Sequence, residues 1–179
     1  MSGPRVRLLA AGHGKRAGGP KAWGHYAGKT LLEAQLGFLS TVTEPESLDI
    51  AIQREWMDRC RALSSRVNWI AADPDGTPLA SLQTLIAATP RGRSFVLHVD
   101  MPVFDLRVWG ALMHASGDAA PIYEGRRGHP VLLEAATLDA VAGLNPATDR
   151  LDSFLRGRPV TEVPVFTGVI FANLNQAAT

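Results

Sequence analysis

Short apolar runs alternate with amphipathic segments along most of the chain. The first apolar run, Val6–Ala10, predicts a buried strand. Apolar runs predict further strands over 48–53, 67–71 and 95–99, and helical spacing predicts helices over 31–39, 54–63, 79–88 and 106–114. Thr30 and Glu33 have the spacing of a capping box, so the first helix is expected to begin at Leu31. Strands that alternate with helices favour a mostly parallel sheet covered on both faces, a three-layer α/β/α fold.

The final third of the chain is less regular. Strands are predicted over 121–123, 131–133, 163–166 and 169–174, and helices over 138–144 and 151–156. A basic, glycine-bearing turn lies between the first two of these strands. There is no repeat, low-complexity segment or long linker, so residues 1–179 are interpreted as one domain.

Net charge, the length of apolar runs and the cysteine count limit the classes of protein to which this chain can belong. A net charge of +1 indicates no general attraction to nucleic acid or to a membrane surface. No apolar run approaches the length of a membrane span, and the single cysteine, Cys60, is typical of a reducing compartment. We therefore expect a cytoplasmic protein, a monomer or a weak homo-oligomer, without nucleic-acid or membrane partners.

The loop after the first strand is the strongest chemical feature of the sequence. It contains four glycines and three cations within ten residues: Gly12, Gly14, Lys15, Arg16, Gly18, Gly19 and Lys21. Glycines allow backbone N–H groups to surround an anion, and cations add charge-assisted contacts. Because loops at the ends of parallel strands commonly bind phosphates, this loop is interpreted as a site for a nucleoside triphosphate.

Two common phosphate-binding motifs fit this region poorly. The segment 24–30 ends in Gly-Lys-Thr, but only three residues separate its glycines, whereas a Walker loop needs four. The segment 12–17 satisfies the dinucleotide pattern G-x-G-x-x-A, yet Gly18-Gly19-Pro20 prevents the helix that should follow. A long basic loop that wraps over phosphates remains, with a solvated surface loop as the alternative.

The loop resembles the signature of the nucleotidyltransferases with a glycosyltransferase-A-like fold, and within them the molybdenum-cofactor guanylyltransferase and cytidylyltransferase group. Four further segments resemble motifs of that group in the expected order: Gly28-Lys-Thr-Leu-Leu-Glu33, Asp73 with Gly76-Thr-Pro-Leu-Ala-Ser81, Val99-Asp-Met-Pro102 and Gly125-Arg-Arg-Gly-His-Pro130. The resemblance covers nearly the whole chain. It implies the Rossmann-like nucleotide-diphospho-sugar transferase fold.

The same resemblance implies a Mg²⁺-dependent reaction. A phosphate on a small-molecule acceptor, molybdopterin in that group, would attack the α-phosphate of GTP or CTP and release pyrophosphate. The nucleotide is expected to contact Leu9, Ala10, Ala11, Gly12, Gly14, Lys21, Gln53, Asp73, Ser81 and Asp100. Gln53 stands where the guanylyltransferases usually carry asparagine. Arg16 and Lys21 are expected to offset phosphate charge, and both are predicted, with Asp100, to be catalytic.

Metal and acceptor contacts complete the expected site. Asp100 is the first predicted metal ligand, because carboxylate oxygens suit magnesium and Asp100 ends a strand. Asn173 and Asn175 resemble the closing N-x-N motif of the guanylyltransferases and are the further predicted ligands. His98 is interpreted as a core or supporting residue. The acceptor is expected to contact Arg126, Arg127, Gly128 and His129, whose cationic and imidazole donors suit a phosphate.

Two other functions stay open at this point. The enzyme class could be the same with a sugar phosphate or alcohol phosphate as acceptor. Alternatively, the chain could be a regulatory protein that binds nucleotide without turnover, since asparagines replace the carboxylates of the cytidylyltransferases near the C-terminus.

Overall fold

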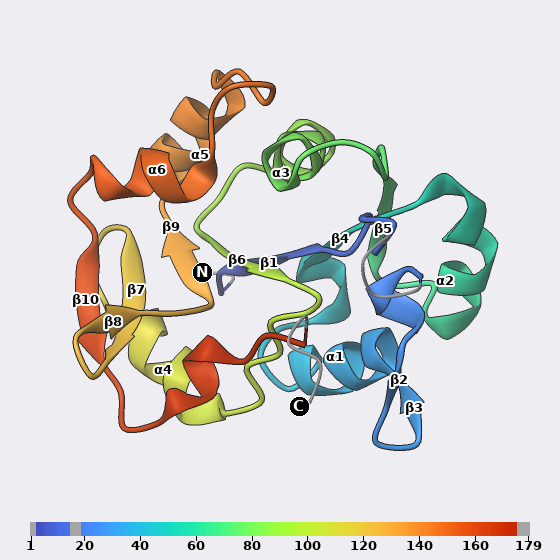
Figure 1. Ribbon diagram of the computed structural model, residues 1–179, viewed down its shortest axis with the longest axis horizontal. Coiled ribbons are helices and arrows are strands. Elements are labelled where there is room, and N and C mark those ends of the chain that lie inside the picture. The colour runs from blue at the N-terminus through green and yellow to red at the C-terminus, as the bar shows by residue number, and fades with distance from the viewer. Residues whose placement is uncertain (1–2, 15–18, 175–179) are drawn as a thin grey trace.

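One mostly parallel sheet forms the centre of the molecule (Figure 1). The computed structural model describes residues 3–14 and 19–174, and within them eight strands join this sheet. The strands are β1 (Arg5–Leu9), β4 (Leu48–Ile52), β5 (Asn68–Ala71), β6 (Ser94–His98), β7 (Ala119–Tyr123), β8 (Arg126–Arg127), β9 (Val131–Leu133) and β10 (Thr161–Pro164). Their order is β10-β7-β9-β6-β1-β4-β5, and β8 pairs with β7 outside this path.

β1 is the central strand of the parallel part. It pairs in parallel with β4 on one side and with β6 on the other, and β4 pairs in parallel with β5. Leu8 and Leu9, which lie on opposite faces of the sheet, are both buried, as expected for a strand covered on both faces. The carboxyl ends of these four strands therefore meet at one edge of the sheet. β9 runs antiparallel to β6, so β9 begins at that same edge.

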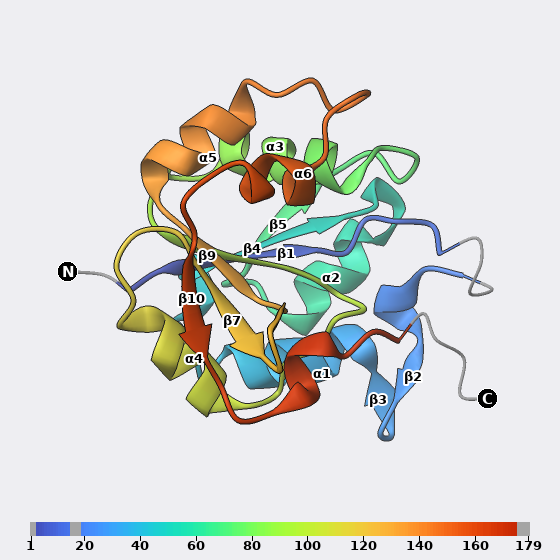
Figure 2. The same ribbon diagram turned by 60° about the vertical axis from the view of Figure 1, so that its left-hand side comes forward.

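Helices cover both faces of the sheet, as Figures 1 and 2 show. The helices are α1 (Leu31–Leu39), α2 (Met57–Leu63), α3 (Pro78–Ala88), α4 (Leu106–Met113), α5 (Ala135–Ala142) and α6 (Leu151–Arg156). Residues of α1, α2 and α4 contribute to one apolar core, and residues of α3, α5 and α6 contribute to the core on the opposite face. The predicted three-layer α/β/α architecture is confirmed.

The beginning of α1 follows the sequence pattern closely. Thr30 accepts a hydrogen bond from the backbone N–H of Glu33, and the Glu33 carboxylate accepts one from the backbone N–H of Thr30. α5 begins earlier than predicted, at Ala135, because a residue from another element caps it. The buried Asp118 carboxylate accepts hydrogen bonds from the Glu134 N–H (2.8 Å) and the Thr137 hydroxyl (2.6 Å). A cap that is remote in sequence leaves no local signal.

The strand predicted over 169–174 is wrong. Gly168–Phe171 form a short 3-10 helix, which starts where the Thr167 hydroxyl accepts a hydrogen bond from the Val169 N–H (3.2 Å). Ile170 is fully buried, and its carbonyl accepts from the N–H of His129 (3.0 Å). The apolar run is therefore explained by burial of one turn against the 128–130 segment, which a run of this length cannot distinguish from a strand.

A small hairpin between the glycine-rich loop and α1 was not predicted. β2 (His25–Tyr26) pairs with β3 (Lys29–Thr30) around Ala27 and Gly28, which have φ values of +48° and +84°. In the region predicted as a basic turn, Arg126 and Arg127 instead form the short strand β8. No helix among the described residues has the length and apolar character needed to cross a membrane.

Candidate active site

Four loops meet at the carboxyl edge of β1, β4, β5 and β6. They bring together the described parts of the glycine-rich loop, Gln53, Asp73 and Asp100, as the parallel topology requires. Arg16 and Asn175 lie outside the described residues, so their predicted roles are not addressed by the structure. Two cavities open on either side of the end of β1, and an ion pair lies near that point.

The ion pair joins Lys21 to Asp100. The Lys21 Nζ lies 2.8 Å from Oδ2 of Asp100, a residue that is only 7% exposed. Burial by itself would raise the pKa of Asp100, but the hydrogen bond and positive charge of Lys21 outweigh it, so the pKa lies below its usual value. Lys21 reaches this point because the short 3-10 helix η2 (Lys21–Trp23) follows Pro20. The pair holds an ionised carboxylate at the centre of the predicted phosphate site.

The backbone around Asp100 is fixed from several directions. The Val99 N–H donates to the carbonyl of Leu9 at the end of β1 (3.0 Å), and the Leu174 N–H donates to the carbonyl of Asp100 (2.8 Å). Nε2 of Gln35, which lies on α1 and is 1% exposed, donates to the carbonyl of Val99 (3.1 Å). Nothing in the sequence pattern of α1 singled out Gln35. Its position shows that α1 supports the segment that presents Asp100.

The hydrogen bond from the Leu174 N–H to the backbone carbonyl of Asp100 places the neighbouring residue, Asn173, beside the segment that presents Asp100. Both residues supply oxygen atoms, which are the ligands that magnesium prefers. The described residues contain no group of three or more His, Cys, Asp or Glu side chains that could hold a metal ion. The protein donors therefore fit a cation that takes only a few protein ligands and completes its shell with phosphate oxygens and water.

The glycine-rich loop closes tightly where it can be described. Gly14 has φ +61°, and a Cβ atom there would lie 1.9 Å from the carbonyl oxygen of Gly19. The Gly19 N–H donates to the Gly14 carbonyl (3.3 Å). Any side chain at residue 14 would therefore force the two ends of the loop apart. This explains the glycine at residue 14 by the close approach of two backbone segments.

The predicted nucleotide contacts at residues 9–11 are largely buried. Leu9, Ala10 and Ala11 are at most 6% exposed, and the Ala10 N–H donates to Ala51 (3.0 Å) in continuation of the sheet. Ser81 is also buried, at 7% exposure, in the first turn of α3. These residues therefore lie beneath the surface at the carboxyl edge of the sheet.

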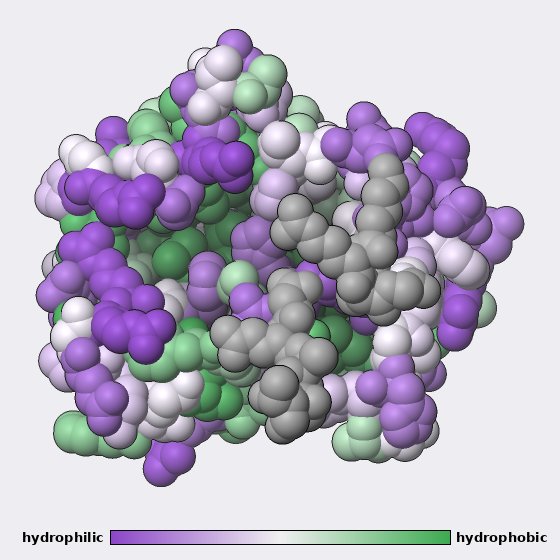
Figure 3. Space-filling view, viewed as in Figure 1, coloured by the Kyte–Doolittle hydropathy of each residue, from purple (hydrophilic) through white to green (hydrophobic). Residues whose placement is uncertain are grey.

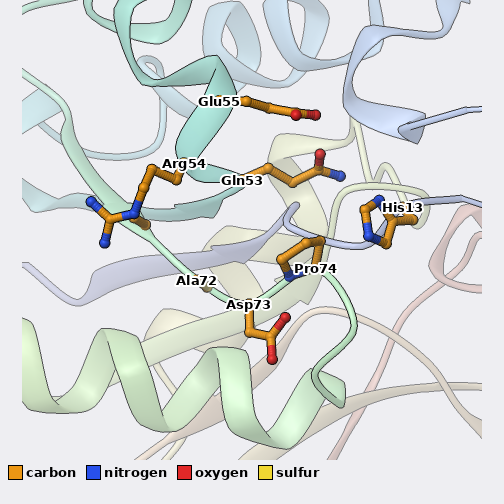
Figure 4. A pocket seen from close by; sticks show the side chains of 8 residues that line it. His13, Gln53, Arg54, Glu55, Ala72, Asp73 and Pro74 are labelled. Carbon is orange, nitrogen blue, oxygen red and sulfur yellow. The ribbon is translucent and has the colours of Figure 1, made fainter.

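The first cavity has a volume of about 610 Å³ and lies over the ends of β4 and β5 (Figure 4). Gln53 and Asp73, two of the predicted nucleotide contacts, line it together with His13. Figure 4 shows the Gln53 side chain extending toward His13, whereas Arg54 extends away from it. The remaining lining residues are Glu55, Ala71, Ala72 and Pro74.

Gln53 has a structural task in this cavity. Its Nε2 donates to the carbonyl of Gly12 (3.3 Å), and its Oε1 accepts from Nε1 of Trp56 (3.2 Å). The residue is only 2% exposed. Gln53 therefore ties the glycine-rich loop to the end of β4, which an asparagine, with its shorter side chain, could not do from the same backbone position. The Asp73 carboxylate accepts from the N–H of Asp75 (3.0 Å) and shapes the turn before α3.

The second cavity, of about 360 Å³, lies on the other side of β1. His98 and His129 line it, with ring centroids 6.1 Å apart and rings nearly perpendicular. Burial lowers the pKa of both imidazoles, that of His129 to about 4, so both are neutral at pH 7. Nδ1 of His129 is buried and has no hydrogen-bond partner among the described residues. Cavity walls made by α3 and α6 were not predicted, because apolar helix faces carry no motif.

The structure separates the four residues predicted to contact the acceptor. Only His129 lines the second cavity. Gly128 packs against Ile170, where a Cβ atom would lie 2.5 Å from the Ile170 carbonyl oxygen. On the exposed strand β8, Arg127 pairs with Glu162 (2.8 Å), and the Arg126 guanidinium lies 4.4 Å from the ring centre of Phe171. Neither arginine is brought to the cavity in this arrangement.

A parallel sheet with a buried carboxylate–lysine pair and a glycine-rich loop at its carboxyl edge is the arrangement of an α/β phosphate-transfer enzyme. The sequence profile of the MobA-like NTP transferase domain matches residues 6–163. The chain therefore belongs to the MobA-like NTP transferase family, which makes it a nucleotidyltransferase by class, as the sequence predicted. No curated protein sequence matches the chain at a significant level.

Several solved structures share the fold of this chain. Rv0371c from Mycobacterium tuberculosis H37Rv has a TM-score of 0.77 at 21% identity, covering 92% of this chain and 89% of that chain. Its manganese complex has a TM-score of 0.72 at 19% identity, with coverage of 92% and 89%. Molybdopterin-guanine dinucleotide biosynthesis protein A from Archaeoglobus fulgidus has a TM-score of 0.63 at 19% identity, with coverage of 89% and 83%. At such identities the likeness establishes the fold.

Proposed function

We propose that the protein transfers a nucleoside monophosphate from GTP or CTP to the phosphate of a small molecule and releases pyrophosphate. The observation that carries the proposal is the Lys21–Asp100 pair at the end of β1, with a cavity on each side. The first cavity, with Gln53, Asp73 and the glycine-rich loop, suits the nucleoside. The second cavity, with His98 and His129, suits the acceptor. The first candidate acceptor is molybdopterin, since the structural neighbour from Archaeoglobus fulgidus is a molybdopterin-guanine dinucleotide biosynthesis protein.

The reaction requires positioning more than covalent chemistry from the protein. An oxygen of the acceptor phosphate forms a bond to the α-phosphorus, and the bond from that phosphorus to the pyrophosphate oxygen breaks. Lys21 would offset negative charge on the phosphates, and the loop backbone from Gly12 to Gly14 would donate N–H groups. Asp100 and Asn173 would hold a divalent cation, which when bound supplies positive charge to the phosphates. Mg²⁺ is proposed, and the manganese complex of Rv0371c supports a divalent ion.

Two measurements on the full chain test this function. Thermal-shift titration of GTP, CTP, ATP and UTP with Mg²⁺ should show a stabilisation that grows with the concentration of GTP or CTP. Pyrophosphate release should then require both that triphosphate and molybdopterin. Absence of stabilisation by all four triphosphates would contradict the proposal. Stabilisation without pyrophosphate release from molybdopterin, sugar phosphates or alcohol phosphates would instead favour a regulatory nucleotide-binding protein.

A further inference from the structure

The second cavity contains information about the acceptor that the family match does not provide. It adjoins the proposed reaction centre directly, because His98 precedes Asp100 by two residues and Met101 follows it. Its other walls come from the end of β1, the start of α3, the start of β9 and the segment 146–155. A molecule bound here would therefore have one end beside Asp100 and its body between α3 and α6.

The walls of this cavity are mainly apolar. Figure 3 shows apolar surface at the bottom of a hollow left of the centre, beneath the region of α5 and α6 in Figure 1. Eight large apolar side chains, two of them prolines, line the cavity: Leu9, Pro78, Leu79, Met101, Val131, Pro146, Leu151 and Leu155. Contact with such walls stabilises a ligand in proportion to the apolar area that leaves water.

Several polar residues of the wall already have partners within the protein. The Thr77 hydroxyl donates to the Pro146 carbonyl (3.1 Å), and the Asp149 carboxylate accepts from the Asn145 N–H (2.8 Å). Asp152 pairs with Arg156 (3.0 Å). Against the apolar part of the wall, the hydroxyls of a sugar would lose hydrogen bonds to water, which costs binding free energy.

Two imidazole rings, those of His98 and His129, add polar groups to this mainly apolar wall. His98 and His129 lie in the wall with ring centroids 6.1 Å apart, and a ring nitrogen of each can make a hydrogen bond. Nδ1 of His129 is available for such a bond because it has no partner among the described residues. Arg126 and Arg127 are held on the outer strand by Phe171 and Glu162, whereas Arg150 lines the cavity.

We propose that the acceptor phosphate is carried by a flat ring or aliphatic body that presents apolar faces to the wall, rather than by a sugar, and that this body binds between α3 and α6 against His129. The proposal rests on the proposed function, because that function places a phosphorylated acceptor in this cavity. The phosphate would face Asp100 and Lys21, and the body would fill the apolar hollow.

Calorimetric titration of two phosphomonoesters tests the inference. The protein is first loaded with a non-hydrolysable analogue of the triphosphate that stabilises it, together with Mn²⁺. We then expect 1-naphthyl phosphate to bind at least about tenfold more tightly than glucose 1-phosphate, since its ring gains apolar contact while the sugar hydroxyls lose water. Equal affinities, or tighter binding of glucose 1-phosphate, would overturn the inference.

Matched variants locate the binding. Leu151→Asn places an amide in the cavity wall and should weaken 1-naphthyl phosphate binding about tenfold. The control Leu106→Asn makes the same change on α4, at a side chain that is already 52% exposed, and should leave the affinity unchanged. Val131→Thr, which keeps the shape of the side chain, should weaken binding by a smaller factor and serves if Leu151→Asn does not fold.

The outcomes separate this inference from the proposed function. If no triphosphate stabilises the protein, the proposed function fails before the acceptor is tested. If a triphosphate binds but 1-naphthyl phosphate has no advantage, only the inference about the acceptor fails. Tight binding that Leu151→Asn and Val131→Thr both leave unchanged would place the ligand elsewhere and would also overturn it.

Discussion

The two cavities beside the end of β1 are built in different ways. The first is formed by loops that follow β4 and β5, and its polar side chains, Gln53, Asp73 and His13, come from short motif-bearing segments. The second is formed mainly by apolar faces of α3 and α6, with two neutral imidazoles. The proposed nucleotide side therefore depends on loop geometry held by hydrogen bonds, whereas the proposed acceptor side depends on how two helices pack over the sheet.

The Lys21–Asp100 ion pair near the end of β1 gives the largest expected effect. Asp100→Ala should lower kcat by on the order of 10³-fold, because it removes the buried carboxylate proposed to hold the divalent cation. Pyrophosphate release measures the effect, and circular dichroism checks that the variant is folded. The control Asp58→Ala removes a fully exposed carboxylate on α2 and should leave kcat unchanged. A fully active Asp100→Ala protein would contradict the metal assignment.

Replacement of Lys21 tests whether the cation of the ion pair contacts the phosphates. Lys21→Met should lower kcat about 10²-fold, since one charge-assisted contact to the phosphates is lost while the shape of the side chain is largely kept. Lys29→Met, on the exposed strand β3, is the matched control and should behave as wild type. Equal loss of activity in both variants would indicate a general effect of charge rather than a local role for Lys21.

The neutral imidazole of His129 in the second cavity should make the free energy of unfolding depend on pH. The folded-state pKa of His129 is about 4, below its unfolded value near 6.5, so the unfolded chain binds the proton first as pH falls. The free energy of unfolding should therefore fall between pH 6.5 and pH 4, with His129 contributing about 2 kcal/mol of that loss by pH 4.5.

Urea unfolding of wild type and His129→Gln at pH 7 and pH 4.5 measures this contribution. The variant lacks the titrating group, so its loss of stability on acidification should be smaller by about 2 kcal/mol. An identical loss in the two proteins would show that His129 is protonated in the folded state near its ordinary pKa.

Replacement of Gln53 gives the smallest expected effect on activity. It should change KM for only one of the two substrates, and it therefore distinguishes the proposed nucleotide side from the proposed acceptor side. Gln53→Leu removes the hydrogen bonds to Gly12 and Trp56 and should raise KM for the triphosphate about tenfold, with KM for the acceptor unchanged. Gln83→Leu is the matched control, because Gln83 joins α3 to the carbonyls of Val141 and Leu144 outside the nucleotide side. It should lower stability without changing KM for the triphosphate.

Local patterns predicted the elements whose causes are local. The capping box at Thr30 and Glu33 marked the start of α1, and apolar runs marked β1, β4, β5 and β6. The strand predicted over 169–174 was wrong, because the burial of Ile170 against the 128–130 turn is a contact between distant segments. The early start of α5 has the same kind of cause, since Asp118 comes from the end of a different loop.

The candidate site divides in the same way. Asp100, Gln53 and Asp73 could be found from sequence because parallel strands bring their carboxyl ends to one edge. The separation of Arg126 and Arg127 from His129 could not, since all three residues belong to one short segment. Pairing of β8 with β7 holds both arginines on an exposed strand, whereas the chain after Gly128 turns inward against Ile170.

By itself, the sequence determined the α/β class, the family and the carboxylate at the centre of the site, because each depends on patterns within short segments. The tertiary structure alone decided that Lys21 pairs with Asp100, that Gln35 and Leu174 support that segment, and that α3 and α6 enclose an apolar cavity. These features depend on contacts between residues far apart along the chain, whose meeting is set by the packing of helices on the sheet.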